Sequence, residues 1–319
     1  MSDTSDKKII AVVGATGAQG GGLVRAILDD PGGGFAARAI TRHPDSDAAR
    51  ALADRGAEVV AGDVDDADSL ARAFEGAYGA YCVTFFWAHF SPARELDDAR
   101  RLAEAAAGAR LTHVIWSTLE DTRKWVPLDD ARMPTLQEQY KVPHFDAKGE
   151  ANRFFTDLGV PTTFLLASFY WDNLIHFGSG PKKGADGTYA LTLPIGQAPM
   201  AGIAAEDIGR CAYGIFKAGA ASIGQTIGVA GEQLTGDEMA SKLSRALGLA
   251  VRYNEVSPEV YRGFGFPGAD DLGNMFQFYR DFAADVNATR DVARSRALNP
   301  ALQSFDAWLA ANASRIPLD

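Results

Sequence analysis

The sequence predicts an α/β fold built on a doubly wound parallel sheet, and two observations carry this prediction. The first is a strand-like run at residues 9–13, whose side chains are apolar on both faces, as in a parallel sheet covered by helices. The second is the alternation of strand-like and helix-like segments through the first half of the chain. Such alternation produces parallel strands joined by right-handed crossovers. The 319 residues are enough for a large core and two lobes.

The segments follow the first strand in a regular order. Leu23, Val24, Ile27 and Leu28 recur at helical spacing and predict the first helix. Strands are expected at 35–41, 58–62, 80–84, 112–117 and 162–166, helices at 68–74, 92–107 and 206–217, and a hairpin at 187–193.

Three glycines, Gly14, Gly17 and Gly20, stand three residues apart where the first strand gives way to the first helix. Glycines at this turn allow backbone N–H groups to approach a pyrophosphate at the helix N-terminus. The sequence therefore predicts a dinucleotide site. The residues expected to contact the dinucleotide here are Gly14, Thr16, Gly17, Ala18, Gln19 and Gly20.

The end of the second strand indicates which dinucleotide is bound. Proteins that prefer NAD carry an acidic residue about 20 residues after the glycines, which binds the ribose 2′-hydroxyl. This chain has Thr41, Arg42 and His43 there instead. Because a guanidinium can form two charge-assisted bonds to a 2′-phosphate, we expect NADP(H), with hydrogen bonds from Thr41 and His43. The alternative is that Arg42 is a solvated loop arginine.

Two further strand ends carry candidate cofactor contacts. Asp63 follows the third strand, where its carboxylate is placed to accept a bond from the adenine amino group. Thr84 and Phe85, followed by Phe86 and Trp87, come after the fourth strand and are candidates for a wall beside the ribose or nicotinamide. Packing of the aromatic side chains within the core or between lobes is an equally good interpretation.

Composition limits the class of protein. The net charge of −10 argues against a broad basic face for nucleic acid, and residues 1–8 are polar, unlike a signal peptide. No apolar run approaches the roughly 18 residues of a membrane span, so a cytoplasmic location is expected. Cys82 and Cys211 are predicted to be small core residues, and two thiols with five histidines offer no metal-ligand cluster.

A long segment, 119–143, interrupts the alternation and predicts a functional lid or mobile loop. It leads into a helical stretch in which His144 and Lys148 lie one turn apart on the same face. Asp146 and Glu150 lie elsewhere on this helix and are expected to face solvent.

Several motifs together resemble the NmrA-like group of atypical short-chain dehydrogenase/reductases. They are residues 14–21, Thr41-Arg42, 76–78, 144–150, 265–269 and 274–276, which span nearly the whole chain. The resemblance implies a Rossmann-type fold with a smaller C-terminal α+β lobe, and an NADP site built on the glycines and Arg42. Residues 1–166, with a return near 203–230, would form the NADP-binding domain, and 167–202 and 231–319 the smaller lobe.

The resemblance also implies site residues and one departure. Lys148 stands where short-chain dehydrogenases carry the active-site lysine beside the nicotinamide ribose, but His144 replaces the usual tyrosine four residues earlier. Ser117 lies in the region of the usual catalytic serine. The catalytic candidates are therefore Lys148, His144 and Tyr170; Phe169 would line the nicotinamide end and Asn173 would make a polar contact there. The alternative is that His144 has no chemical role.

The main interpretation of the sequence is a redox sensor, and the alternative is a reductase. The missing tyrosine favours a redox sensor that responds to NADP(H) occupancy and passes its state to a protein partner. The aromatic residues around Trp87 favour an NADPH-dependent reductase of a small aromatic carbonyl, quinone or enone. Homodimer formation is left open, and no direct contact with nucleic acid or membrane is expected.

Overall fold

The computed structural model describes residues 7–318. Residues 1–6, which belong to the polar start noted above, lie outside this range. The first half contains β1 (Lys8–Val12), α1 (Ala18–Asp29), β2 (Phe35–Thr41), α2 (Asp47–Asp54), β3 (Glu58–Ala61), α3 (Ala67–Phe74), β4 (Gly79–Cys82), η2 (Phe86–Ala88), α4 (Pro92–Gly108), β5 (His113–Thr118), η3 (Thr122–Lys124), α5 (Pro143–Asp157) and β6 (Thr162–Leu166).

The second half contains shorter strands and more helices. Its elements are β7 (Phe169–Tyr170), α6 (Asn173–His176), β8 (Lys182–Lys183), β9 (Tyr189–Leu193), β10 (Met200–Ile203), α7 (Ala205–Ala218), η4 (Gly219–Ser222), β11 (Thr226–Gly228), β12 (Glu232–Leu234), α8 (Gly236–Leu247), β13 (Val251–Glu255), α9 (Pro258–Arg262), α10 (Ala269–Asp281), α11 (Ala283–Thr289), α12 (Val292–Leu298), α13 (Phe305–Asn312) and η5 (Ala313–Arg315).

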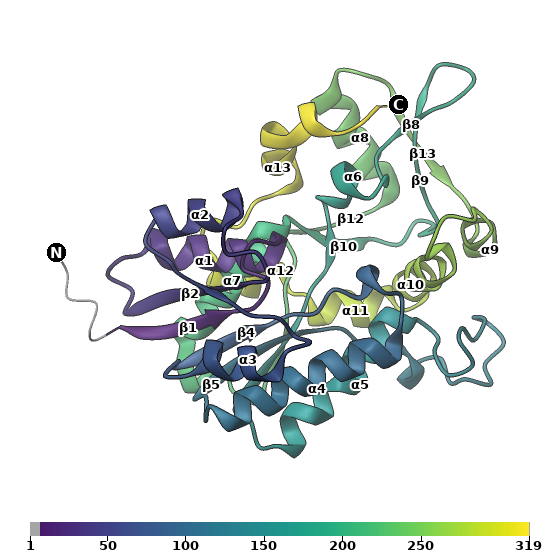
Figure 1. The fold of residues 1–319 in the computed structure, drawn as a ribbon. Helices are drawn as coiled ribbons and strands as arrows, with labels where there is room; N and C mark the ends of the chain where they lie inside the picture. The colour runs from purple at the N-terminus through teal and green to yellow at the C-terminus, as the bar shows by residue number, and fades with distance from the viewer. Residues whose placement is uncertain (1–6, 319) are drawn as a thin grey trace.

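Seven parallel strands form the main sheet in the order β11-β6-β5-β4-β1-β2-β3. Figure 1 shows α3, α4 and α5 on one side of this sheet, with α1, α2 and α7 on the other. Each side has its own apolar core, and α12 packs on α7. The order reverses between β1 and β4, where ligands bind in doubly wound sheets. The predicted α/β fold is confirmed.

The strands at 35–41 and 162–166 have the predicted bounds, whereas β4 ends at Cys82, two residues early. The chain turns away from the sheet there, and this turn directs Thr84 toward α4 and α5. Cys82 and Cys211 are both buried in the cores, as predicted, and burial raises the pKa of each thiol.

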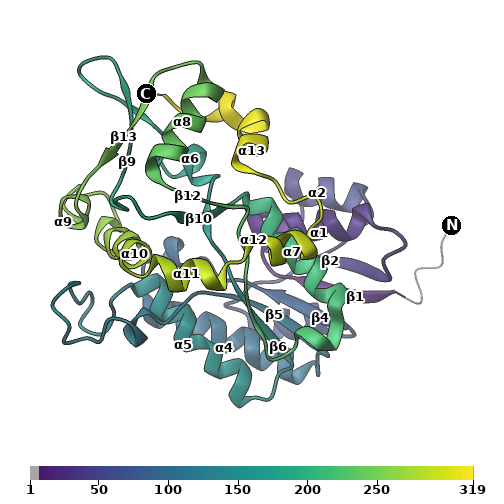
Figure 2. The same ribbon diagram turned by 180° about the vertical axis from the view of Figure 1, so that it is seen from behind.

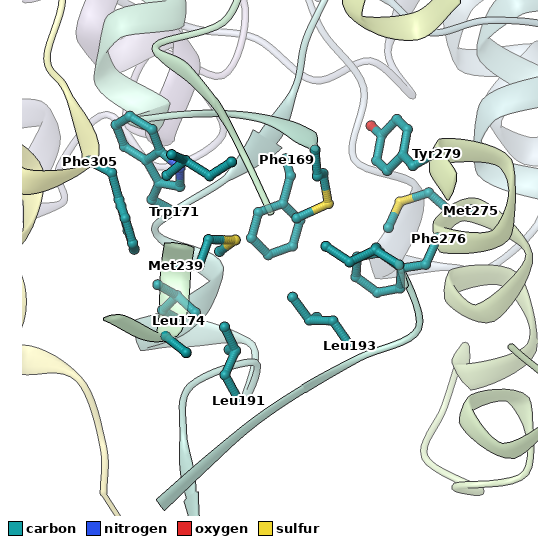
Figure 3. Close-up of a cluster of buried hydrophobic side chains, with 14 of the residues drawn as sticks. Phe169, Trp171, Leu174, Leu191, Leu193, Met239, Met275, Phe276, Tyr279 and Phe305 are labelled. Atoms are coloured by element: carbon teal, nitrogen blue, oxygen red, sulfur yellow. The ribbon is translucent and has the colours of Figure 1, made fainter. Parts of the chain in front are cut away.

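The rest of the chain forms a smaller lobe with two three-stranded sheets, β12-β10-β7 and β13-β9-β8. Figure 2, the view from behind, shows α8, α9 and α10 grouped around these strands, away from β1 and β2. Figure 3 shows part of its apolar core, in which Phe169 lies between Met239 and Phe276. Within the described part of the chain, every helix is too short or too polar to cross a bilayer.

The long segment before α5, for which the sequence predicts a functional lid or mobile loop, is anchored by buried polar contacts. Asp146 accepts hydrogen bonds from the N–H of Thr122 (2.7 Å), Lys141 (2.7 Å) and Val142 (3.1 Å). The expectation that Asp146 faces solvent is therefore wrong, because its carboxylate is fully buried. It accepts N–H groups of the residues just before α5. Glu150 is half-buried and pairs with Arg123 at 3.0 Å.

Candidate functional site

The glycine loop has the backbone that its sequence requires. Gly14 has φ +65°, in the left-handed region that glycine tolerates, and Gly17 begins α1 without a side chain to cap it. The first-turn N–H groups of α1 are therefore left available for an anion. A Cβ at Gly20 would lie only 2.4 Å from the Gly14 oxygen, so glycine is also needed to pack α1 against the loop.

Two cavities adjoin this loop. One, of about 220 Å³, is lined by Ala15 and Thr16 of the loop together with α2. The other, of about 370 Å³, is lined by Ala18 at the start of α1, the start of α7 and the end of α13. The loop therefore has open space on more than one side.

The Gln19 side chain forms hydrogen bonds with three other side chains. Its amide oxygen accepts hydrogen bonds from Ser117 (2.8 Å) and Tyr81, and its amide nitrogen donates to the Tyr170 hydroxyl. These contacts connect α1 to β4, β5 and β7. Burial raises the pKa of Tyr170 to about 12, so its phenol stays protonated near neutral pH.

The ends of β2 and β3 carry the candidate adenosine contacts. The buried Thr41 hydroxyl accepts the His43 N–H at 3.2 Å, which fixes the turn. Arg42 and His43 are exposed, and the Arg42 guanidinium makes no hydrogen bond or ion pair within residues 7–318. Asp63 is half-buried and accepts the Asp65 N–H at 3.1 Å. Arg42 is thus free to bind a ligand group.

Lys148 forms an ion pair with Glu95, which was not among the predicted site residues. Its Nζ lies 2.6 Å from Glu95 of α4, and it donates to the Thr84 hydroxyl (2.5 Å) and carbonyl (3.2 Å). Burial alone would raise the pKa of Glu95, but the Lys148 ammonium, the nearby His89 and the hydrogen bond from Thr84 outweigh it and lower that pKa to about 2. Val83, next to Thr84, lies 3.3 Å from where a Cβ on Gly14 would stand, so this ion pair adjoins the glycine loop.

His144 is held by a second residue that the interpretation missed. Its Nδ1 lies 2.6 Å from Asp271 of α10, and its backbone N–H donates to the other carboxylate oxygen at 3.1 Å. The imidazole ring lies 4.7 Å from the ring of Trp87 and 4.7 Å from that of Phe145. His144 therefore lies between aromatic rings, with a carboxylate behind it.

The remaining candidates are spread over both lobes. Phe85 is 58% exposed, whereas Phe86 is buried beside His144. Phe169 is buried in the small-lobe core, where its ring lies 6.0 Å from Phe276 (Figure 3). Asn173 begins α6 and is half-buried. Among residues 7–318, no group of three or more histidine, cysteine, aspartate or glutamate side chains is placed to hold a metal ion.

A sequence signal existed for Glu95 but not for Asp271. Glu95 lies on the buried stripe of α4 with Ala99, Leu102 and Ala106, and a carboxylate among apolar positions at helical spacing indicates a buried partner. Asp271 is one of two adjacent aspartates in the first turn of α10, a common position for acidic residues. No neighbouring residue in the sequence indicates that Asp271 would bind a histidine.

The fold and the glycine loop together define an α/β protein with a Rossmann-type sheet. The model of the NmrA-like family matches residues 6–309, and the chain belongs to this family, which confirms the predicted resemblance. It is 32% identical over 291 residues to the NmrA-like family domain-containing oxidoreductase FrzB of Cladobotryum sp, covering 85% of this chain and 83% of FrzB. It is 28% identical over 284 residues to oxidoreductase hkm9 of Aspergillus hancockii, covering 84% and 82%. Both are named as oxidoreductases, not as redox sensors.

Solved structures share the fold. NmrA, described as a negative transcriptional regulator, has a TM-score of 0.78 at 25% identity over 95% of each chain. NmrA in complex with NADP has a TM-score of 0.76 at 24% identity, covering 96% of this chain and 95% of NmrA. The Citrobacter sp. triphenylmethane reductase, complexed with NADP(H), has a TM-score of 0.72 at 20% identity, covering 96% and 99%.

Proposed function

We propose that this protein is an NADPH-dependent oxidoreductase that reduces a small aromatic carbonyl, quinone or enone. The observation that carries the proposal is the placement of Lys148 and His144, one turn apart on α5, each held by a buried carboxylate. Lys148 reaches the Thr84 carbonyl, just beyond the end of β4 and near Gly14, which is the edge of the sheet where ligands bind in doubly wound folds. The oxidoreductase names of FrzB and hkm9 support this class.

The cofactor assignment rests on the loop and on Arg42. The uncapped start of α1 offers N–H groups to a pyrophosphate, and the unpaired Arg42 guanidinium is suited to a 2′-phosphate. NmrA has been solved with NAD and with NADP, and the triphenylmethane reductase with NADP(H), so the shared fold accommodates such ligands. We infer that this chain binds NADP(H) in preference to NAD(H).

A bound reduced nicotinamide supplies a hydride to the substrate. The chain must then supply a proton to the substrate oxygen, and histidine is the side chain most often used for such a transfer. His144 is suited to this step because Asp271 occupies Nδ1 and leaves Nε2 for the substrate. In the family pattern the lysine at this position binds a ribose hydroxyl, and Lys148 would do so by exchanging one of its three contacts with Glu95 and Thr84 for the ribose.

Exposed aromatic residues near His144 support an aromatic substrate. Phe85 and Phe90 are 58% and 41% exposed, and Trp87 between them contacts the His144 ring. The loop before α10 approaches from the other lobe, where a Cβ on Gly268 would lie 2.8 Å from the Trp87 ring. Phe264 and Phe266 on that loop are also exposed. Exposed apolar groups of this kind mark binding surfaces.

The redox sensor remains a second candidate because the phenol usually required for catalysis is absent. Position 144 is histidine, and the Tyr170 hydroxyl is already bound by Gln19. A sensor requires only that cofactor binding alter conformation or assembly, and therefore no proton donor. Its protein partner would replace the aromatic substrate at the exposed surface.

NADPH oxidation separates the two functions. We expect steady loss of NADPH absorbance with members of a panel of aromatic aldehydes, quinones and enones. Replacing His144 with alanine should lower turnover by roughly 10² to 10⁴, as for loss of a general acid, while NADPH affinity changes only a few-fold. Absence of turnover on the whole panel, together with a cofactor-dependent change in assembly by light scattering, would instead establish the sensor.

A further inference from the structure

We infer that Asp271 is a positioning residue that sets the protonation geometry of His144. This inference deepens the proposed function. Its kinetic test depends on that function, whereas its spectroscopic test does not. Asp271 is 4% exposed and directs both carboxylate oxygens at His144, one to Nδ1 at 2.6 Å and one to the backbone N–H at 3.1 Å. The contact with the backbone N–H fixes the carboxylate relative to the start of α5. The other carboxylate oxygen is therefore held in line with Nδ1.

The contact determines which ring nitrogen faces the substrate. An ionised carboxylate only accepts hydrogen bonds, so Nδ1 must carry a hydrogen. In the neutral imidazole, Nε2 is then the acceptor, and in the protonated form it is the free donor. Nε2 makes no hydrogen bond with any residue of the described range 7–318. The proton that His144 exchanges is therefore the one on Nε2, directed away from Asp271.

Within residues 7–318, no charged group other than Asp271 forms a hydrogen bond or ion pair with the His144 ring. On the 86–90 segment, His89 lies 3.5 Å from Glu95, and on α5 the Lys148 ammonium is bound to the same Glu95. On α10, the exposed Asp270 accepts the N–H of Asp271 at 2.8 Å. Trp87 and Phe145 contact the ring itself and restrict its rotation. Asp271 is thus the charged group that touches the imidazole.

Packing between the lobes sets the position of Asp271. Gly268, with φ +83°, begins α10 against the Trp87 ring, and Asn274 donates to the carbonyls of Pro134 (2.9 Å) and Lys141 (2.5 Å), just before α5. The pair joins residues 127 positions apart. The His144 side of the site is therefore complete only when α10 is docked on α5.

The tautomer can be measured without turnover. In ¹⁵N-histidine-labelled protein, the five histidines are few enough to assign, with a His144→Gln variant identifying the signals of His144. We expect neutral His144 to carry its proton on Nδ1. In Asp271→Asn, whose amide N–H can donate to Nδ1, the proton should move to Nε2. A wild-type protein with the proton on Nε2 would overturn the inference, even if the variant fails to fold.

Kinetics give the second test. On a substrate that the wild type reduces, Asp271→Asn should lower kcat by roughly 10² to 10⁴, because the protonated ring that donates from Nε2 then loses the carboxylate that accepts from its Nδ1, with NADPH affinity changed only a few-fold. Asp281→Asn, at the exposed far end of α10, is the matched control and should keep wild-type turnover. An Asp271→Asn protein with wild-type kcat contradicts the inference. If the wild type shows no turnover, the proposed function is contradicted but the inference about Asp271 is not. The ¹⁵N spectra test the contact between His144 and Asp271 without turnover.

Discussion

The buried pair of Glu95 and Lys148 leads to a quantitative prediction for Glu95→Gln. The Glu95 carboxylate is fully buried, 2.6 Å from the Lys148 ammonium, and these surroundings lower its pKa from an ordinary 4.5 to about 2. At 1.36 kcal/mol for each pKa unit, ionised Glu95 contributes about 3 kcal/mol to folding. This agrees in size with the about 3–5 kcal/mol lost when one partner of a buried ion pair is removed.

The pH dependence follows from the direction of this change. Because the pKa is lower in the folded state, the contribution is complete above pH 4.5 and is lost as the pH falls toward 2. Glutamine does not titrate, so Glu95→Gln should be less stable than wild type by about 3 kcal/mol at pH 7. The difference should shrink to about 1 kcal/mol by pH 3.

Urea unfolding followed by tryptophan fluorescence at several pH values between 3 and 7 tests this prediction. Glu104→Gln is the matched control, since Glu104 is exposed on the same helix and its replacement should leave both stability and pH dependence near wild type. Equal stability of Glu95→Gln and wild type at pH 7 would refute the argument, as would a difference that stays constant down to pH 3.

Two further predictions concern the nucleotide site. NADP(H) should bind at least about tenfold more tightly than NAD(H), or about 1.4 kcal/mol, and Arg42→Ala should remove most of that preference. Calorimetry that finds equal affinities in the unmodified protein would exclude the role of Arg42. Gly20→Val should abolish nucleotide binding while the fold survives, because even its Cβ would lie 2.4 Å from the Gly14 oxygen. Gly108→Val is the control, since apart from its chain neighbours and its own helix backbone no described atom lies within 4 Å of the added Cβ. Unchanged NADPH affinity in Gly20→Val would contradict the placement.

The sequence by itself determined the features that neighbouring residues encode. The alternation of strands and helices predicted the parallel sheet, and the glycines at 14, 17 and 20 predicted the tight turn into α1. Helical spacing also placed His144 and Lys148 on one face of α5. Periodicity and turn chemistry act over a few residues, so they can be read from the chain directly.

The tertiary structure decided which partners these residues meet. His144 is bound by an aspartate 127 positions away, and Lys148 by a glutamate from another helix. Asp146, expected in solvent, is buried because the preceding loop folds back and donates three backbone N–H groups to it. Such contacts depend on how lobes and loops pack, and a carboxylate in the sequence looks the same whether water or an imidazole will face it.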